Sequence, residues 1–202
     1  MKKFLALCLG VLLASSLFAV ITGSAHDFQA TGWAGGEICL PCHIPHNSDT
    51  TVGDAPLWNH TLPAAGSFTP YGTTLAGTVA GAPNGISLLC LSCHDGVTNV
   101  DAYGGGAGTD VIQNLYVGTT ANVGQDLTDD HPVSIVYNTA NELRVTTTVT
   151  GVGSYTIGDW LFTGGTTVEC SSCHDVHNKY GNSALLKLDN SGSALCLLCH
   201  IK

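Results

Sequence analysis

Cys39-Leu-Pro-Cys42-His43 is the first of four stretches that decide how this 202-residue chain folds. The Cys-x-x-Cys-His pattern occurs three more times, and we number the copies motif 1 to motif 4 in chain order. Motifs 2, 3 and 4 are Cys90-Leu-Ser-Cys93-His94, Cys170-Ser-Ser-Cys173-His174 and Cys196-Leu-Leu-Cys199-His200. This pattern is typical of c-type haem attachment, in which both sulfurs bond to the porphyrin and the histidine is an axial ligand of the iron. The sequence therefore predicts four covalently bound c-type haems.

Three other kinds of protein also contain paired cysteines. An exported chain with this many cysteines can be a disulfide scaffold, paired Cys-x-x-Cys motifs can hold structural zinc, and one pair can form a thioredoxin-type redox site. None of these requires a histidine directly after the second cysteine. The chain has 9 histidines, and one of them follows each of the four pairs. The pattern therefore favours haem attachment over the three alternatives.

Residues 1–25 have the composition of a secretory signal peptide. Two lysines precede an apolar stretch from Phe4 to Ile21, and a short run of small residues follows it. We expect cleavage before His26, which also removes Cys8. The alternative is an uncleaved membrane anchor, since the apolar stretch approaches the ~20 residues that span a bilayer.

The composition is acidic and low in charge. Charged residues make up 10% of the chain, and 6 basic residues face 15 acidic ones. Two of the six basic residues lie in the predicted signal, so the mature chain has no basic patch that could neutralise a nucleic-acid backbone. No later segment is apolar enough to span a membrane. We expect a mature protein outside the cytoplasm, either at the cell surface or extracellular, or alternatively in the periplasm.

Each iron has a second face that needs a ligand. Ligation by methionine is excluded in the mature chain, because the single Met is the initiator. Five histidines lie outside the motifs, which is enough to give every iron a second imidazole with one left over. We predict His46, His60, His131 and His177 as distal ligands, with His26 as a further possible one. The acidic residues 126–130 are interpreted as a solvated turn, since their spacing matches no EF-hand calcium loop.

His46 and His177 each follow a motif histidine by three positions. Residues at i and i+3 project from the same side of a helical turn, whereas the two ligands of one iron stand on opposite faces of the porphyrin. The second histidine of each pair must therefore serve another haem, and this brings two haems close together. Pro45 turns the first pair out of a helix, so His46 can point away from its own haem towards another subunit.

The motifs alternate in type along the chain. Motifs 1 and 3 continue into His-x-x-His-Asn, whereas motifs 2 and 4 lie in Leu-Cys-Leu sequences. This pattern predicts one tetrahaem domain, residues 26–202, made of two two-haem units. The units cover about residues 26–96 and 169–202, and a Gly/Thr-rich insertion of about residues 97–168 separates them.

The expected fold class is a small multihaem cytochrome c with a mostly irregular chain. Helix-forming residues are sparse, so we expect short helical turns at the CxxCH motifs. Alternating residues predict strands over 133–137 and 144–150. We expect one or two β-hairpins, one of which turns at 151–153. The haems would form the core, and covalent haem would then be a condition of folding.

The motifs and their surroundings resemble exported multihaem c-type cytochromes with paired CxxCH motifs. The similar stretches span nearly the whole mature chain and include His26-Asp-Phe, Pro56-Leu-Trp-Asn-His60 and Asp130-His-Pro-Val-Ser. The resemblance is to the tetrahaem and hexahaem outer-surface cytochromes that polymerise into conductive filaments (nanowires) in metal-reducing bacteria. It implies bis-His haems in a continuous row of stacked and T-shaped pairs. It also implies that a histidine of one subunit completes a haem in the next.

This resemblance implies an electron-transport protein rather than an enzyme. The expected partners are further copies of the chain, in a homopolymer with haem contacts between subunits, and redox proteins or extracellular electron acceptors. The low charge density, which reduces repulsion between copies, fits such a polymer. One alternative is a monomeric periplasmic electron shuttle. The other is a multihaem nitrite- or hydroxylamine-type reductase, which needs an open iron and usually a motif ending in Lys, whereas all four motifs here end in His.

The first prediction concerns the mass of the exported protein. Because each motif is expected to bond one porphyrin, intact-mass spectrometry should show the polypeptide without residues 1–25 plus four haem masses. A chain whose mass equals that of the polypeptide alone would rule out covalent haem and revive the disulfide and zinc alternatives.

Overall fold

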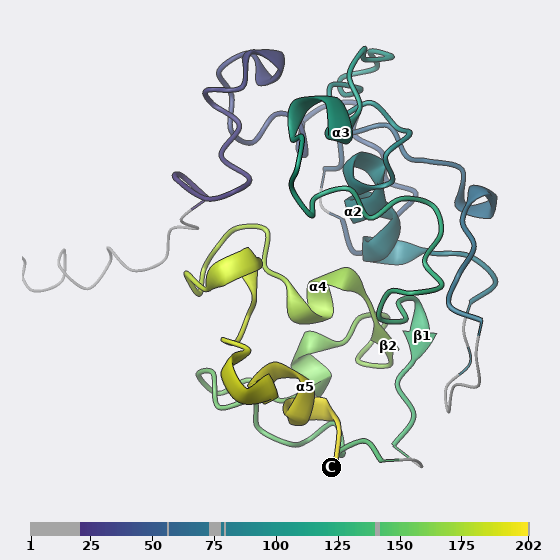
Figure 1. The fold of residues 1–202 in the computed structure, drawn as a ribbon, viewed down its shortest axis with the longest axis vertical. Coiled ribbons are helices and arrows are strands. Elements are labelled where there is room, and N and C mark those ends of the chain that lie inside the picture. The colour runs from purple at the N-terminus through teal and green to yellow at the C-terminus, as the bar shows by residue number, and fades with distance from the viewer. Residues whose placement is uncertain (1–20, 56, 73–77, 79, 140–141, 202) are drawn as a thin grey trace, which may run out of the picture.

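The computed structural model describes residues 21–55, 57–72, 78, 80–139 and 142–201. Most of the predicted signal, residues 1–20, lies outside the described part. In Figure 1 the N-terminal half of the chain fills the upper part of the molecule and the C-terminal half fills the lower part. Within the described residues, no helix is both long and apolar enough to cross a membrane.

Regular secondary structure is short throughout the described chain, and most of it lies at the motifs. Helix α2 (Gly85–His94) contains all of motif 2, while α4 (Cys170–Cys173) and α5 (Ala194–Cys199) contain the cysteines of motifs 3 and 4. Helix α3 (Ile112–Leu115) packs near the end of α2 (Figure 1). The remaining helical elements are single 3₁₀ turns at Gly32–Ala34, Ala65–Ser67, Gly158–Trp160, Ser183–Leu185 and Ser191–Ser193.

Helix α2 ends directly after the motif 2 histidine because of Asp95. The Asp95 side chain is buried and accepts hydrogen bonds from the backbone N–H groups of Val97 (2.9 Å) and Thr98 (2.7 Å). These bonds satisfy the acceptor locally and favour a turn over further helix. Gly96 then adopts a positive φ of 72° next to Asn122, whose side chain leaves no room for a Cβ atom. The turn therefore fixes the position at which His94 leaves the helix.

A buried carboxylate joins α2 to α4. Glu169 is only 2% exposed, and its Oε2 accepts hydrogen bonds from the hydroxyls of Ser87 (2.5 Å) and Ser134 (3.0 Å). The Ser87 hydroxyl also accepts the backbone N–H of Cys170 (3.1 Å), and the Ser172 hydroxyl accepts the backbone N–H of Glu169 (2.9 Å). Helices α2 and α4 face each other at the junction of the two parts of the molecule (Figure 1). Glu169 therefore fixes motif 3 beside motif 2.

The β structure is smaller than the alternating residues predict. Within the described residues, one sheet of two strands forms, in which β1 (Ile135–Val136) pairs antiparallel with β2 (Thr167–Val168). The expected reversal at 151–153 is present, with Thr150 N–H donating to Tyr155 O (2.8 Å), but only Val149 and Thr156 form a bridge. Val149 is 68% exposed, so no apolar surface holds this run in a longer strand.

Three small apolar clusters replace a single protein core. One joins Ala55, Trp58 and Leu89, and a second joins Phe68, Leu91 and Leu127. The third, in the C-terminal half, consists of Tyr137, Ile157 and Leu161. Each cluster packs against a motif helix or its cysteines, including Cys42 in the first and Cys199 in the third.

The stretch of residues 97–168 is not a separate body. Backbone hydrogen bonds join it to the N-terminal unit at Thr61 and Thr69, which bond to Ala102 and Gln125. The same stretch reaches motif 4, where the N–H of Arg144 donates to the carbonyl of Cys199 (2.8 Å). These residues therefore surround both pairs of motifs.

Replacing Glu169 tests whether this network holds the two halves together. Glu169→Ala leaves the Ser87 and Ser134 hydroxyls without their buried acceptor, so we expect a loss of about 2 kcal/mol in unfolding free energy. Chemical denaturation of the haem-loaded protein, followed by circular dichroism, measures the change. The exposed Glu37→Ala is the matched control. Equal denaturation midpoints for the two variants would show that the network contributes nothing.

Candidate haem-binding sites

Each motif presents its histidine at the end of a helical turn. In motifs 1, 3 and 4 the histidine N–H donates to the carbonyl of the first cysteine, at 2.8, 3.1 and 2.9 Å. After this bond the backbone becomes extended at His174 and at His200. The histidine therefore leaves the turn while the two cysteines remain on it. All eight motif cysteines are free thiols, which is the state that can bond to a porphyrin.

The four motifs are neighbours in space in the same order as in the chain. The pKa of Cys93 is raised to about 12, mainly by burial and then by the nearby Cys42 of motif 1. A hydrogen bond to Cys170 of motif 3 is the main cause that raises the pKa of Cys90 in motif 2. The pKa of Cys173 in motif 3 is raised to about 11, mainly by burial and then by Cys199 in motif 4. Each motif therefore has a cysteine near a cysteine of the next motif in the chain.

Three motif histidines face a histidine from a distant part of the chain. The ring centroids of His43 and His177 are 6.2 Å apart, those of His94 and His26 6.0 Å, and those of His200 and His131 6.4 Å. Two imidazoles bound to opposite sides of one metal ion have centroids about 6 Å apart, because each metal–nitrogen bond is about 2 Å long and each centroid lies about 1 Å behind its nitrogen. The three spacings therefore fit an iron between each pair of rings.

Backbone carbonyls orient several of these rings. Nδ1 of His94 lies against the carbonyl of Ala121, Nδ1 of His174 is 2.8 Å from the carbonyl of Ala184, and Nδ1 of His131 is 3.0 Å from that of Pro132. A carbonyl only accepts, so each Nδ1 must carry the hydrogen. Nε2 then keeps the lone pair that a metal needs.

His26 is held in its neutral form. Its pKa is lowered to about 4, mainly by burial and to a smaller extent by His94, His174 and His177. Burial also lowers the pKa of His94. Both rings of this pair are therefore neutral at physiological pH, as ligation of iron requires. The sequence marks His26 only as a possible ligand, because neither its spacing nor its neighbours connect it to motif 2.

His60 lies in a different setting from the other predicted ligands. It is 3% exposed, with Nδ1 3.0 Å from the carbonyl of Thr61 and Nε2 3.1 Å from the carbonyl of Val100. Nε2 also lies 3.5 Å from the sulfur of Cys93 in motif 2, but the structure pairs this ring with no motif histidine among the described residues. Its ligation of iron stays a prediction that rests on the sequence.

His46 and His174 have no such partner ring among the described residues. His46 is exposed at the surface. The ring of His174 is exposed and is oriented by its bond to Ala184. The described part of the chain thus contains one motif histidine and one surface histidine that each face no other imidazole.

The residues present fit four c-type haems in their donor chemistry. Each motif offers two free thiols and an imidazole, and three motifs have a second imidazole at a suitable spacing. Bound haem would supply a one-electron Fe(III)/Fe(II) couple. The sequence contains no comparable signal for Glu169, a single acidic residue before motif 3, although it fixes that motif in place.

Removing a distal imidazole tests the ring pairs. We expect His177→Ala and His26→Ala each to convert one haem from low-spin to high-spin, because one iron loses its sixth ligand. His60→Ala separates the two assignments, because the ring distances predict that every haem stays low-spin, whereas the sequence prediction of His60 as a ligand requires one high-spin haem. Optical and electron paramagnetic resonance spectra measure the change. A high-spin haem in His60→Ala, with none in the other two variants, would contradict the pairing by ring distance.

One family model matches the chain. Residues 163–202, which contain motifs 3 and 4, match the family described as the doubled CXXCH motif. A comparison with curated proteins found no significant match. CXXCH motifs indicate covalently bound c-type haem, and their doubling is typical of cytochromes with several haems. The match and the motif geometry together support a multihaem c-type cytochrome that acts in electron transfer.

Proposed function

We propose that this chain is a tetrahaem c-type cytochrome that carries electrons along a row of bis-His haems. The observation that carries the proposal is the set of three ring pairs, each of which joins a motif histidine to a histidine from another segment. An iron with imidazole on both faces has no open position for a substrate, so it exchanges electrons only.

The ring pair of His43 and His177 supports close packing of the haems. His177 follows the motif 3 histidine by three residues, yet its ring faces motif 1. The haem on motif 1 and the haem on motif 3 would therefore share one short segment of chain. The proximity of successive motifs, through Cys42 and Cys93 and then Cys173 and Cys199, supports a continuous row.

We also propose that copies of the chain assemble head to tail, with His46 of one copy completing the haem on motif 3 of the next. His174 faces no other imidazole in the described part of its own chain, and His46 is exposed and faces none either. A contact between two different surfaces that does not close produces an open filament. Such a filament would lie outside the cytoplasm and pass electrons to redox proteins or extracellular acceptors.

The iron proposed at motif 3 would lack a second histidine in a single copy of the chain, and this suits a second function. A multihaem reductase of the nitrite or hydroxylamine type needs one open iron, and a single copy of the chain would have one at motif 3. A monomeric periplasmic shuttle would share this feature. Assembly and iron ligation must therefore be measured on the same variants.

The decisive variant is His46→Ala. If His46 reaches the next copy, the variant should contain one high-spin haem and only dispersed particles by electron microscopy of the secreted fraction. The matched control is His131→Ala, which should also contain one high-spin haem but should still form filaments, since its partner His200 is in the same chain. Dispersed particles from the unaltered protein would favour the shuttle, and rapid nitrite binding by its motif 3 haem would favour the reductase.

A further inference from the structure

Motifs 2 and 3 continue in the same way, because an aspartate follows the histidine of each. Asp95 follows His94, and Asp175 follows His174. Each of these carboxylates accepts hydrogen bonds from backbone N–H groups two to four residues further along the chain. The two haem sites therefore have one carboxylate at the same position beside the motif histidine, and a difference between them has to come from other charges.

A lysine distinguishes motif 3 from motif 2. The backbone N–H of Lys187 donates to the carbonyl of Cys173 (2.8 Å), so this residue lies directly against motif 3. Its Nζ lies over two aromatic rings, 5.4 Å from the ring centroid of Trp160 and 5.8 Å from that of Phe162. Trp160 is 5% exposed, and its 3₁₀ turn contacts α4, which contains the motif 3 cysteines. Both ends of the lysine are therefore fixed beside this motif.

The ammonium of Lys187 is partly shielded from solvent. Of the basic residues in the described part of the chain, Lys187 alone is half-buried, whereas Arg144 and Lys179 are exposed. Burial lowers the pKa of Lys187, but the Asp175 carboxylate counteracts this effect and favours the ammonium form. A charge that is withdrawn from bulk water acts more strongly on its surroundings than an exposed one, because less solvent screens it.

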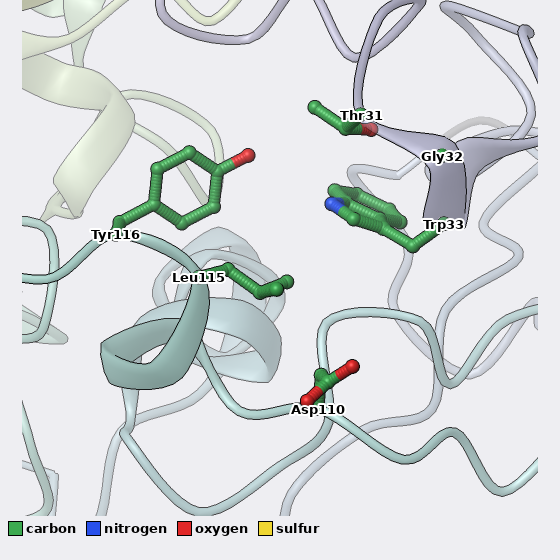
Figure 2. Close-up of a pocket in the computed structure, with 6 residues that line it drawn as sticks. All are labelled: Thr31, Gly32, Trp33, Asp110, Leu115 and Tyr116. Atoms are coloured by element: carbon green, nitrogen blue, oxygen red, sulfur yellow. The ribbon is translucent and has the colours of Figure 1, made fainter.

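The surroundings of motif 2 contain carboxylates without a matching cation. The chain has no Lys or Arg over residues 4–143. From His26, the ring that faces motif 2, aromatic contacts lead through Phe28 (5.5 Å) to Trp33, which is 4.8 Å from Phe28. Trp33 lines a cavity of about 400 Å³, and the one charged residue in its lining is Asp110 (Figure 2). The part of the chain that supplies both histidines of this site thus brings carboxylates but no lysine or arginine.

We propose that the Lys187 ammonium raises the reduction potential of the haem on motif 3 above that of the haem on motif 2. A nearby positive charge stabilises Fe(II) relative to Fe(III), because reduction adds one negative charge to the site. An electron then passes from motif 2 to motif 3, with one iron oxidised to Fe(III), the other reduced to Fe(II), and no bond or proton moved. The inference rests on the proposed row of haems, and the favoured position of the electron is the haem that His46 of the next copy would complete.

The test removes the charge and then restores it. In Lys187→Gln, one of the four one-electron steps should move to lower potential, so that near its midpoint the ratio of oxidised to reduced haem rises by roughly threefold or more at a fixed solution potential. Lys187→Arg keeps the charge and should keep the step in place. The matched control is Lys179→Gln, which removes the same charge from an exposed side chain whose Nζ lies over Tyr155 (5.0 Å) and Tyr180 (5.5 Å), and it should leave this step unchanged. Optical and electron paramagnetic resonance titrations of the haem-loaded protein measure the four steps.

The affected haem identifies the site. His177→Ala, His26→Ala and His131→Ala mark the haems of motifs 1, 2 and 4 by their high-spin signals. Lys187→Gln combined with each of them should every time shift a haem other than the one that becomes high-spin. In the unaltered protein, the step of the remaining haem, on motif 3, should lie above the step that His26→Ala assigns to motif 2.

Three results would overturn this inference and leave the proposed electron-transfer function intact. They are unchanged potentials in Lys187→Gln, a shift at a haem other than that of motif 3, and an equal shift of the same step in Lys179→Gln. An exported protein without covalent haem would overturn both. If Lys187→Gln does not fold, Lys187→Met decides the outcome, because it removes the charge and keeps an unbranched apolar chain on the two aromatic rings.

Discussion

Two imidazoles that bind one iron must approach it from opposite faces, and the proposed arrangement of this chain depends on that constraint. A helical turn with two cysteines presents one imidazole, so the second has to come from elsewhere. The rings that face His43, His94 and His200 come from residues 177, 26 and 131. In the proposed structure each iron would therefore connect two segments far apart in the chain, as a disulfide does in other small exported proteins.

In the proposed structure, this constraint would explain how so little regular structure can hold a chain of 202 residues. The described strands are two residues long, and the apolar clusters contain three buried residues each. Clusters of this size contribute little of the apolar burial that a conventional domain needs. The Glu169 network and the carbonyls that orient the histidine rings place the motifs, and four proposed porphyrins would supply most of the missing apolar surface.

The low number of basic residues has a consequence for the proposed cofactors. Four haems would add eight carboxylates to an already acidic chain that has no Lys or Arg between residues 4 and 143. Such groups are satisfied by neutral N–H and O–H donors when cations are absent. The same scarcity of cations leaves little charge on the surface to oppose contacts between copies.

The sequence alone determined the chemistry of the four motifs, because the spacing of Cys90, Cys93 and His94 within one helical turn is a local property that needs no tertiary contact. It also showed that five histidines were available as second ligands. Tertiary structure alone decided which of them face a motif histidine: His26 faces His94, whereas the ring nitrogens of His60 face backbone carbonyls and the sulfur of Cys93. Spacing along the chain carries no information about rings that meet from more than a hundred residues apart, as His43 and His177 do, since the path of the intervening backbone sets their distance. The role of Glu169 was hidden for the same reason, because its partners Ser87 and Ser134 lie in other segments.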